Sequence, residues 1–85
     1  MGAAIQVEVQ ESTTVDLLLK ASGGSPLLSL VELATVLKRT PAGLRFTLGS
    51  DNELARRLLP AKKRVGRRVF FRVHDIARFL DEDDA

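Results

Sequence analysis

The chain has 85 residues, of which 45% are hydrophobic, no cysteine and a formal net charge of +2. A chain of this length forms one small domain with a modest core, and the lack of cysteine excludes disulfides and thiolate chemistry. No apolar run approaches the roughly 20 residues of a membrane-spanning helix, and the N-terminus has no secretory signal pattern. We therefore expect a cytoplasmic protein without a membrane partner.

The small net charge conceals a strongly basic central segment. Residues 38–72 carry eleven of the thirteen lysines and arginines but only two of the eleven acidic residues, which gives this segment a charge of +9. Both flanking segments are acidic. Such segregation is typical of a surface that binds a polyanion, because dense charge of one sign repels itself when nothing offsets it.

Residues 1–26 are interpreted as an arm and linker. Ile5–Gln10 alternates apolar and polar side chains, which predicts a short strand. Ser12 to Thr14 offer helix caps before the apolar residues at 15, 17, 18 and 19. Glycine, serine and proline at 22–26 mark a break. The arm either folds back on the core or forms a self-association surface. We favour self-association, because the acidic arm would be held away from a polyanion.

A helix is predicted over about 30–39. Ser29 and Glu32 form the S-x-x-E pattern of a capping box. Apolar residues at 30, 33, 34 and 37 share one helical face, and cations at 38 and 39 suit the C-terminal end of the helix dipole.

Two further short helices are predicted. Thr40 is a suitable cap and Pro41 a suitable first residue for a helix that stops at Gly49, with leucines 44 and 48 inward and positions 42 and 46 outward. A second S-x-x-E pattern, from Ser50 to Glu53, predicts a helix over about 51–58, with arginines 56 and 57 outward.

A basic β-hairpin and a closing helix end the pattern. Residues 69, 71 and 73 are apolar and alternate with Phe70 and Arg72, which is the period of a strand. A turn at Gly66-Arg67 joins this strand to residues 61–65; placing glycine first favours a two-residue turn, whereas matching the two valines that flank it favours three. Ile76, Phe79 and Leu80 then share one helical face.

Helix, tight turn, helix, basic hairpin and helix are the layout of a winged helix-turn-helix. The stretches "LLSLVELATVLKRTPAGLRFTL" and "RVGRRVFFRVHDIARFLD" also resemble the small DNA-binding domains of the MerR-like and excisionase class, over about residues 27–81. The expected fold class is α+β, with three to four short helices, a two-stranded hairpin wing, the N-terminal arm and an acidic tail at 82–85.

The resemblance implies sequence-specific binding of double-stranded DNA without enzymatic activity. The protein would be either an excisionase-type directionality and architectural factor of recombination or a transcription regulator of a mobile genetic element such as a plasmid. Duplex DNA is the expected partner, in a nucleoid-associated location. A homodimer or DNA-dependent oligomer and a recombinase are further candidate partners, and no cofactor or small-molecule ligand is expected.

Thirteen residues are candidates for DNA contacts. Arg45 on the 41–48 helix either pairs with a guanine edge or contacts phosphate, Phe46 either touches a thymine methyl or packs under the 51–58 helix, and Ala42 shares their outward face. Cationic side chains pair with phosphate oxygens. The candidates for phosphate contacts are Lys38, Arg39, Arg56, Arg57, Lys62, Lys63, Arg64, Arg67, Arg68 and Arg72.

The two phenylalanines of the hairpin are expected to lie on opposite faces of its second strand. Phe71 is expected in the core. Phe70, on the opposite face, either stacks on a base or is shielded by neighbouring arginine stems, and we favour the shielding.

The residue types exclude several chemistries. The chain has no tyrosine and one histidine, His74, with no nucleophile near it in sequence, so we expect no catalysis and no metal site. RNA binding is disfavoured, because no aromatic platform is evident. The alternative from another class is a non-catalytic interaction adaptor whose arm carries the function and whose basic face is incidental.

Overall fold

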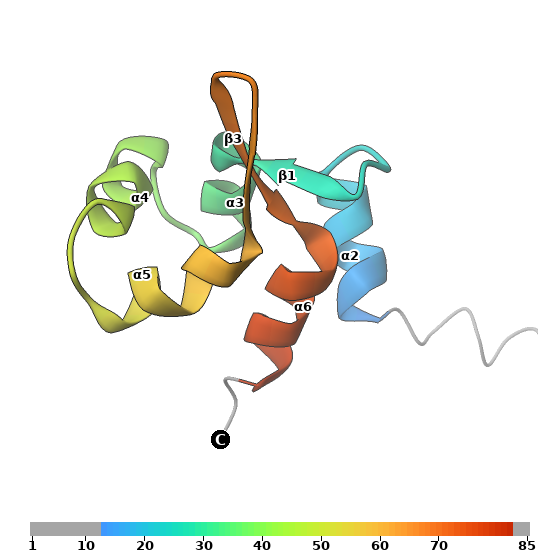
Figure 1. Cartoon of the computed structure of the whole chain (residues 1–85). Coiled ribbons are helices and arrows are strands. Elements are labelled where there is room, and N and C mark those ends of the chain that lie inside the picture. The colour runs from blue at the N-terminus through green and yellow to red at the C-terminus, as the bar shows by residue number, and fades with distance from the viewer. Residues whose placement is uncertain (1–12, 83–85) are drawn as a thin grey trace, which may run out of the picture.

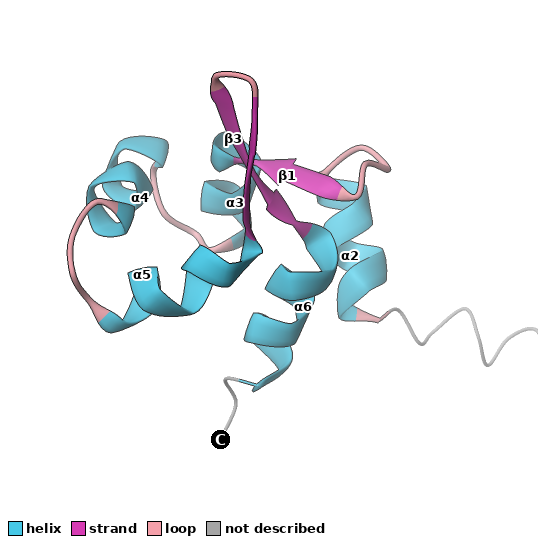
Figure 2. Ribbon diagram, viewed as in Figure 1, coloured by secondary structure: helices cyan, strands magenta, loops and turns pink. Residues whose placement is uncertain are grey.

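A computed structural model describes residues 13–82, and within them the fold is α+β. Five α-helices surround a three-stranded antiparallel sheet, and the β2–β3 hairpin projects from the helices (Figures 1 and 2). The elements are α2 (Thr14–Ala21), β1 (Leu27–Ser29), α3 (Leu30–Val36), α4 (Pro41–Leu48), α5 (Glu53–Leu58), a 3₁₀ turn (Leu59–Ala61), β2 (Lys62–Val65), β3 (Arg68–Arg72) and α6 (Val73–Glu82). None of these helices is long and apolar enough to cross a bilayer.

The predicted hairpin is present as β2–β3, but a third strand that was not predicted, β1, joins it, and the strand order is β1-β3-β2. β1 pairs with the base of β3, and Leu28 lies opposite Phe71. A strand of three residues has too few positions to display an alternating pattern, and its pairing depends on β3, which lies far along the chain. The sequence therefore contains no local signal for β1.

The hairpin has a two-residue turn, which settles its register. Val65 pairs with Arg68, so Gly66 and Arg67 are the two central residues. Gly66 has a φ of 62°, a conformation that glycine adopts without steric cost at the first position of such a turn.

The core receives side chains from every helix and from the sheet. Phe71 and Leu28 of the sheet pack with apolar residues of the helices, and Phe71 is fully buried as expected. The other fully buried large side chains are Leu33, Leu44, Leu58, Val73 and Ile76. Leu33, Leu44 and Ile76 were predicted to face inward from the spacing of apolar residues in their helices.

Helix α3 begins at the predicted residue but ends earlier than predicted. Ser29 and Glu32 form the capping box at the start of α3, but the helix ends at Val36 and not near 39. Lys38 has a φ of 61°, and this left-handed residue ends the helical hydrogen bonding. α4 is as predicted, with Thr40 as its N-cap and Gly49 as its C-cap.

The cap of α5 differs from the expected one. The N-cap is Asn52, whose Oδ1 accepts from the Ala55 N–H over 2.8 Å, so the helix starts at Glu53. The Ser50 hydroxyl donates to the Phe46 carbonyl at the end of α4, over 3.0 Å. The S-x-x-E pattern at 50–53 was misleading, because Ser50 still belongs to the turn that ends α4.

The N-terminal helix α2 packs on the same core as the rest of the domain. Thr13 and Asp16 form its capping box, and Leu18 is buried in the core. The Thr14 hydroxyl donates to Asp81 Oδ1 of α6 over 2.6 Å, and Figure 1 shows the two helices side by side. The strand expected at 5–10 and most of the acidic tail lie outside the described residues. Self-association through the arm stays a prediction.

Candidate nucleic-acid interface

The outward side of α4 carries the three candidates for base contacts. Leu44 is fully buried on the opposite side, which fixes the rotation of the helix about its axis. Ala42, Arg45 and Phe46 are therefore exposed. Phe46 is 77% exposed, so it does not pack under α5, and that alternative is wrong. A large apolar side chain so open to water on a short helix is available for a contact with a partner.

The β2–β3 hairpin separates apolar and cationic side chains between core and solvent. Val69 and Phe71 lie on the core side, with Phe71 opposite Lys62 on β2. The Arg68 guanidinium lies over the ring of half-buried Phe70, 5.5 Å from its centroid, so an arginine covers this ring with its head group, whereas the stem was expected to do so. Five hairpin cations are exposed: Lys62, Lys63, Arg64, Arg67 and Arg68.

These five cations have no acidic partner within the described part of the chain. The ion pairs of residues 13–82 involve Arg56 and Arg72, and the hairpin cations above take no part in them. Their positive charges therefore repel one another across a narrow hairpin. An external polyanion would relieve this repulsion.

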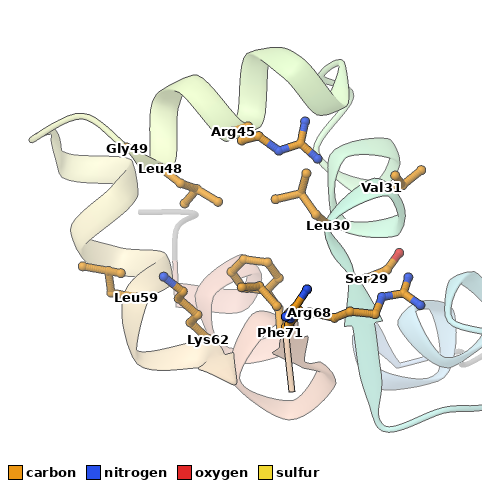
Figure 3. A pocket seen from close by; sticks show the side chains of 12 residues that line it. Ser29, Leu30, Val31, Arg45, Leu48, Gly49, Leu59, Lys62, Arg68 and Phe71 are labelled. Carbon is orange, nitrogen blue, oxygen red and sulfur yellow. The ribbon is translucent and has the colours of Figure 1, made fainter. Parts of the chain in front are cut away.

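A groove of about 520 Å³ joins α4 to the hairpin. It brings Arg45 of α4 together with Lys62, Arg67 and Arg68 of the hairpin, although Arg45 lies at least 17 residues before these cations in the sequence. Figure 3 shows Arg45 reaching from α4 towards α3 above Leu30, with Lys62 and Phe71 across the groove. None of the described residues that line the groove is acidic. An anion placed here would meet cations from two elements.

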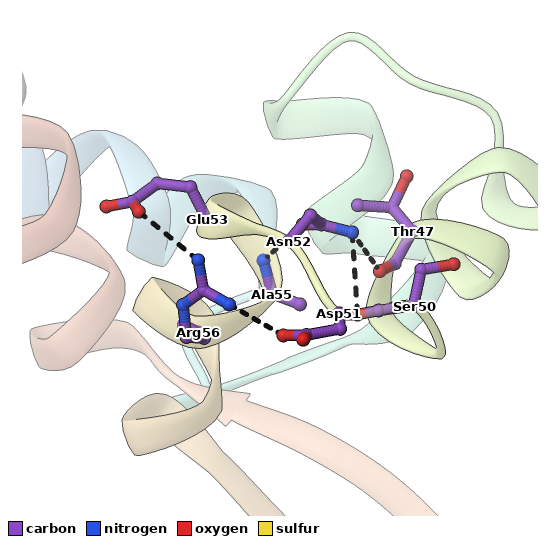
Figure 4. A network of polar contacts seen from close by, with 7 residues as sticks. All are labelled: Thr47, Ser50, Asp51, Asn52, Glu53, Ala55 and Arg56. Atoms are coloured by element: carbon purple, nitrogen blue, oxygen red, sulfur yellow. Dashed lines mark hydrogen bonds and ion pairs between the residues drawn. The ribbon is translucent and has the colours of Figure 1, made fainter.

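Two of the predicted phosphate ligands lie near acidic groups. Arg56 pairs with Asp51, with 2.6 Å between Nη1 and Oδ1, and approaches Glu53 at 3.7 Å (Figure 4). Arg72 lies 3.7 Å from an oxygen of Asp75 and donates to the Pro60 carbonyl. The carboxylates offset the field that a phosphate would feel, so both arginines are weaker candidates than the hairpin cations.

The remaining three predicted ligands lie away from the hairpin. Arg57 places its guanidinium over the Phe79 ring of α6, 4.8 Å from the centroid. Arg39 donates to the Thr47 hydroxyl over 3.2 Å and so ties the turn to α4. Lys38 is exposed in the same turn. The turn cations therefore flank α4, whereas the Arg57 guanidinium is held against α6.

The apolar part of the groove was not predicted from the sequence. Leu30 and Val31 of α3, Leu48 of α4 and Leu59 line it together with the cations. Leucines and valines in amphipathic segments normally indicate core, and these residues carry no motif that distinguishes them.

Comparisons with models of protein families, with curated proteins and with solved structures gave no match.

Proposed function

We propose that the protein binds double-stranded DNA through a winged helix-turn-helix. In this proposal α3 and α4 are the helix-turn-helix, α4 enters the major groove and the β2–β3 hairpin is the wing on the backbone. The function is non-catalytic. The order of the elements, with a short turn between α3 and α4 and a basic hairpin before the closing helix, supports this assignment.

The observation that carries the proposal is the arrangement of charge around one groove. Arg45 and three hairpin cations surround it, and the five exposed hairpin cations form no ion pair within residues 13–82. Guanidinium and ammonium groups placed at spaced positions on a projecting hairpin match the repeated phosphates of a duplex.

Affinity and specificity are assigned to different elements. The hairpin cations, with Lys38 and Arg39 beside α4, would bind phosphates and position the domain. Arg45 would read a guanine edge, because arginine paired bidentately with guanine is the commonest specific contact in the major groove. Phe46 and Ala42 would contact thymine methyl groups.

The biological role proposed is that of an excisionase-type architectural factor or of a transcription regulator of a mobile element, acting on the nucleoid in the cytoplasm. The sequence resemblance supports both roles. DNase footprinting separates them: an excisionase-type factor would protect repeated sites at an attachment sequence, whereas a regulator would protect an inverted repeat at a promoter.

Titration of a 20-base-pair duplex at increasing salt tests DNA binding. If about five phosphates are neutralised, the logarithm of the binding constant should fall against the logarithm of salt concentration with a slope of about −4 to −5. An adaptor whose basic face is incidental would not bind the duplex. A slope shallower than about −2 would also contradict the proposal.

A further inference from the structure

The groove between α3, α4 and the hairpin has an apolar floor as well as a basic rim. Half-buried Leu30 and Leu48 line it above Phe71, and Figure 3 shows these side chains pointing into the space between the elements. Two of the exposed large apolar side chains also belong to it. Val31 of α3 is 56% exposed and Leu59, after α5, is 48% exposed. The apolar surface thus extends beyond the hollow itself.

DNA binding accounts for the rim but not for the floor. Phosphates and sugars pair with cations and donors, and a phosphodiester backbone has no bulky apolar group to fill a hollow lined by Leu30 and Leu48. Two solvent-exposed apolar residues beside the hollow would gain nothing from a phosphate nearby. The groove therefore has a chemistry of its own.

We propose that this groove binds an acidic peptide segment of a partner protein that carries bulky apolar side chains. The apolar side chains occupy the floor between Leu30 and Leu48, and carboxylates pair with the rim cations Arg45, Lys62 and Arg68. The volume of about 520 Å³ lies within the range of sites that enclose a ligand, roughly 300–1,000 Å³. A small organic acid would engage one or two of the cations and leave the flanking valine and leucine in water, whereas a peptide covers both.

Peptide binding and DNA binding use the same rim cations, so the two ligands would exclude each other. This consequence rests on the proposed DNA binding, but the peptide site itself does not. A partner with such a segment would remove the protein from DNA, with the wing cations as the shared element.

The test uses a fluorescein-labelled peptide of twelve residues that contains four glutamates and three leucines, followed by anisotropy. Two control peptides replace the leucines by serine or the glutamates by glutamine. Because each buried leucine contributes transfer free energy, the serine peptide should bind at least about 10-fold more weakly, and the glutamine peptide should lose affinity as well. Equal binding of the leucine and serine peptides would overturn the proposal, because charge alone would then explain the attraction.

Two variants locate the site on the protein. V31S and L59S should each weaken binding of the leucine peptide by about 5-fold or more. L17S is the matched control, since Leu17 of α2 is 55% exposed and lies outside the groove; it should leave peptide binding unchanged. Circular dichroism confirms that each variant is folded.

Binding of a 20-base-pair duplex to the same variants distinguishes the two proposals. V31S and L59S should bind the duplex as the parent protein does. If they weaken duplex binding and leave peptide binding unchanged, the groove belongs to the DNA interface and the peptide proposal is wrong. If the parent protein binds the peptide but not the duplex, the DNA proposal is wrong and the peptide proposal is supported.

Discussion

Lys38 ends α3 with the same left-handed backbone conformation with which Gly23 ends α2, with φ values of 61° and 71°. In both helices the following residue donates its N–H to a carbonyl of the last turn over 2.8 Å. Glycine adopts this conformation without steric cost, whereas a side chain at this position is strained. In the turn of the proposed helix-turn-helix, a lysine thus occupies a position where glycine would make the protein more stable.

Replacement of Lys38 by glycine should therefore stabilise the protein. We expect K38G to raise the free energy of unfolding by about 1 kcal/mol, measured by urea denaturation, and to weaken binding to all duplexes alike through the lost charge. Gly23→Ala is the matched control: its added Cβ meets no atom within 4 Å, so only the backbone conformation opposes it. It should cost about 1 kcal/mol. A less stable K38G would contradict the strain at Lys38.

The adjacent leucines of α2 should differ strongly in their effect on stability. Leu18 is 3% exposed in the core and Leu17 is 55% exposed. Leu18→Ala should cost about 2–5 kcal/mol in the free energy of unfolding, because it leaves a cavity, whereas Leu17→Ala should change it by less than about 0.5 kcal/mol. Equal small effects would show that α2 contributes little to the stability of the domain.

Asn52, and not Ser50, should determine the start of α5. Asn52 accepts from the Ala55 N–H and its Nδ2 donates to the Thr47 carbonyl over 3.0 Å, so it joins α5 to the end of α4. Asn52→Ala should cost about 1–2 kcal/mol in thermal or urea unfolding, and Ser50→Ala less than about 0.5 kcal/mol. If Ser50→Ala were the more destabilising of the two substitutions, Ser50 would be the N-cap of α5, as the sequence pattern suggested.

The tip of the hairpin should contribute to DNA affinity through charge. Arg67→Ala with Arg68→Ala should weaken binding to all duplexes alike and reduce the salt slope by about 2, since each lost phosphate contact contributes about 0.9. Arg56→Ala is the control, because its guanidinium pairs with Asp51 at 2.6 Å, and it should leave the slope nearly unchanged. A loss at Arg56 as large as that at the tip would place the backbone contacts on α5.

Arg45 should carry sequence information. A preferred site is first selected from a random duplex library. Arg45→Ala should then cost about 1–3 kcal/mol in binding that site, with little change for random DNA. An equal loss on both kinds of duplex would assign Arg45 to the phosphate backbone.

Part of the candidate interface was predictable because it depends on short-range rules. The outward face of α4 follows from its 3.6-residue period, and Leu44 confirms the predicted rotation. The exposure of the hairpin cations follows from their charge, because lysine and arginine are almost never fully buried without a partner. The acidic partner of Arg56 was not predicted, because it depends on where α5 starts, and that start was misjudged.

The sequence by itself determined the local elements, since their signals act within a few residues. Thr40 caps α4 and Gly66 permits the hairpin turn, because each satisfies a backbone requirement of its immediate neighbours. Only the tertiary structure decided the pairing of β1 with β3 and brought Val31 and Leu59 to the lining of one groove. These contacts join residues far apart in the chain, and their free energy comes from packing and burial that no local pattern records.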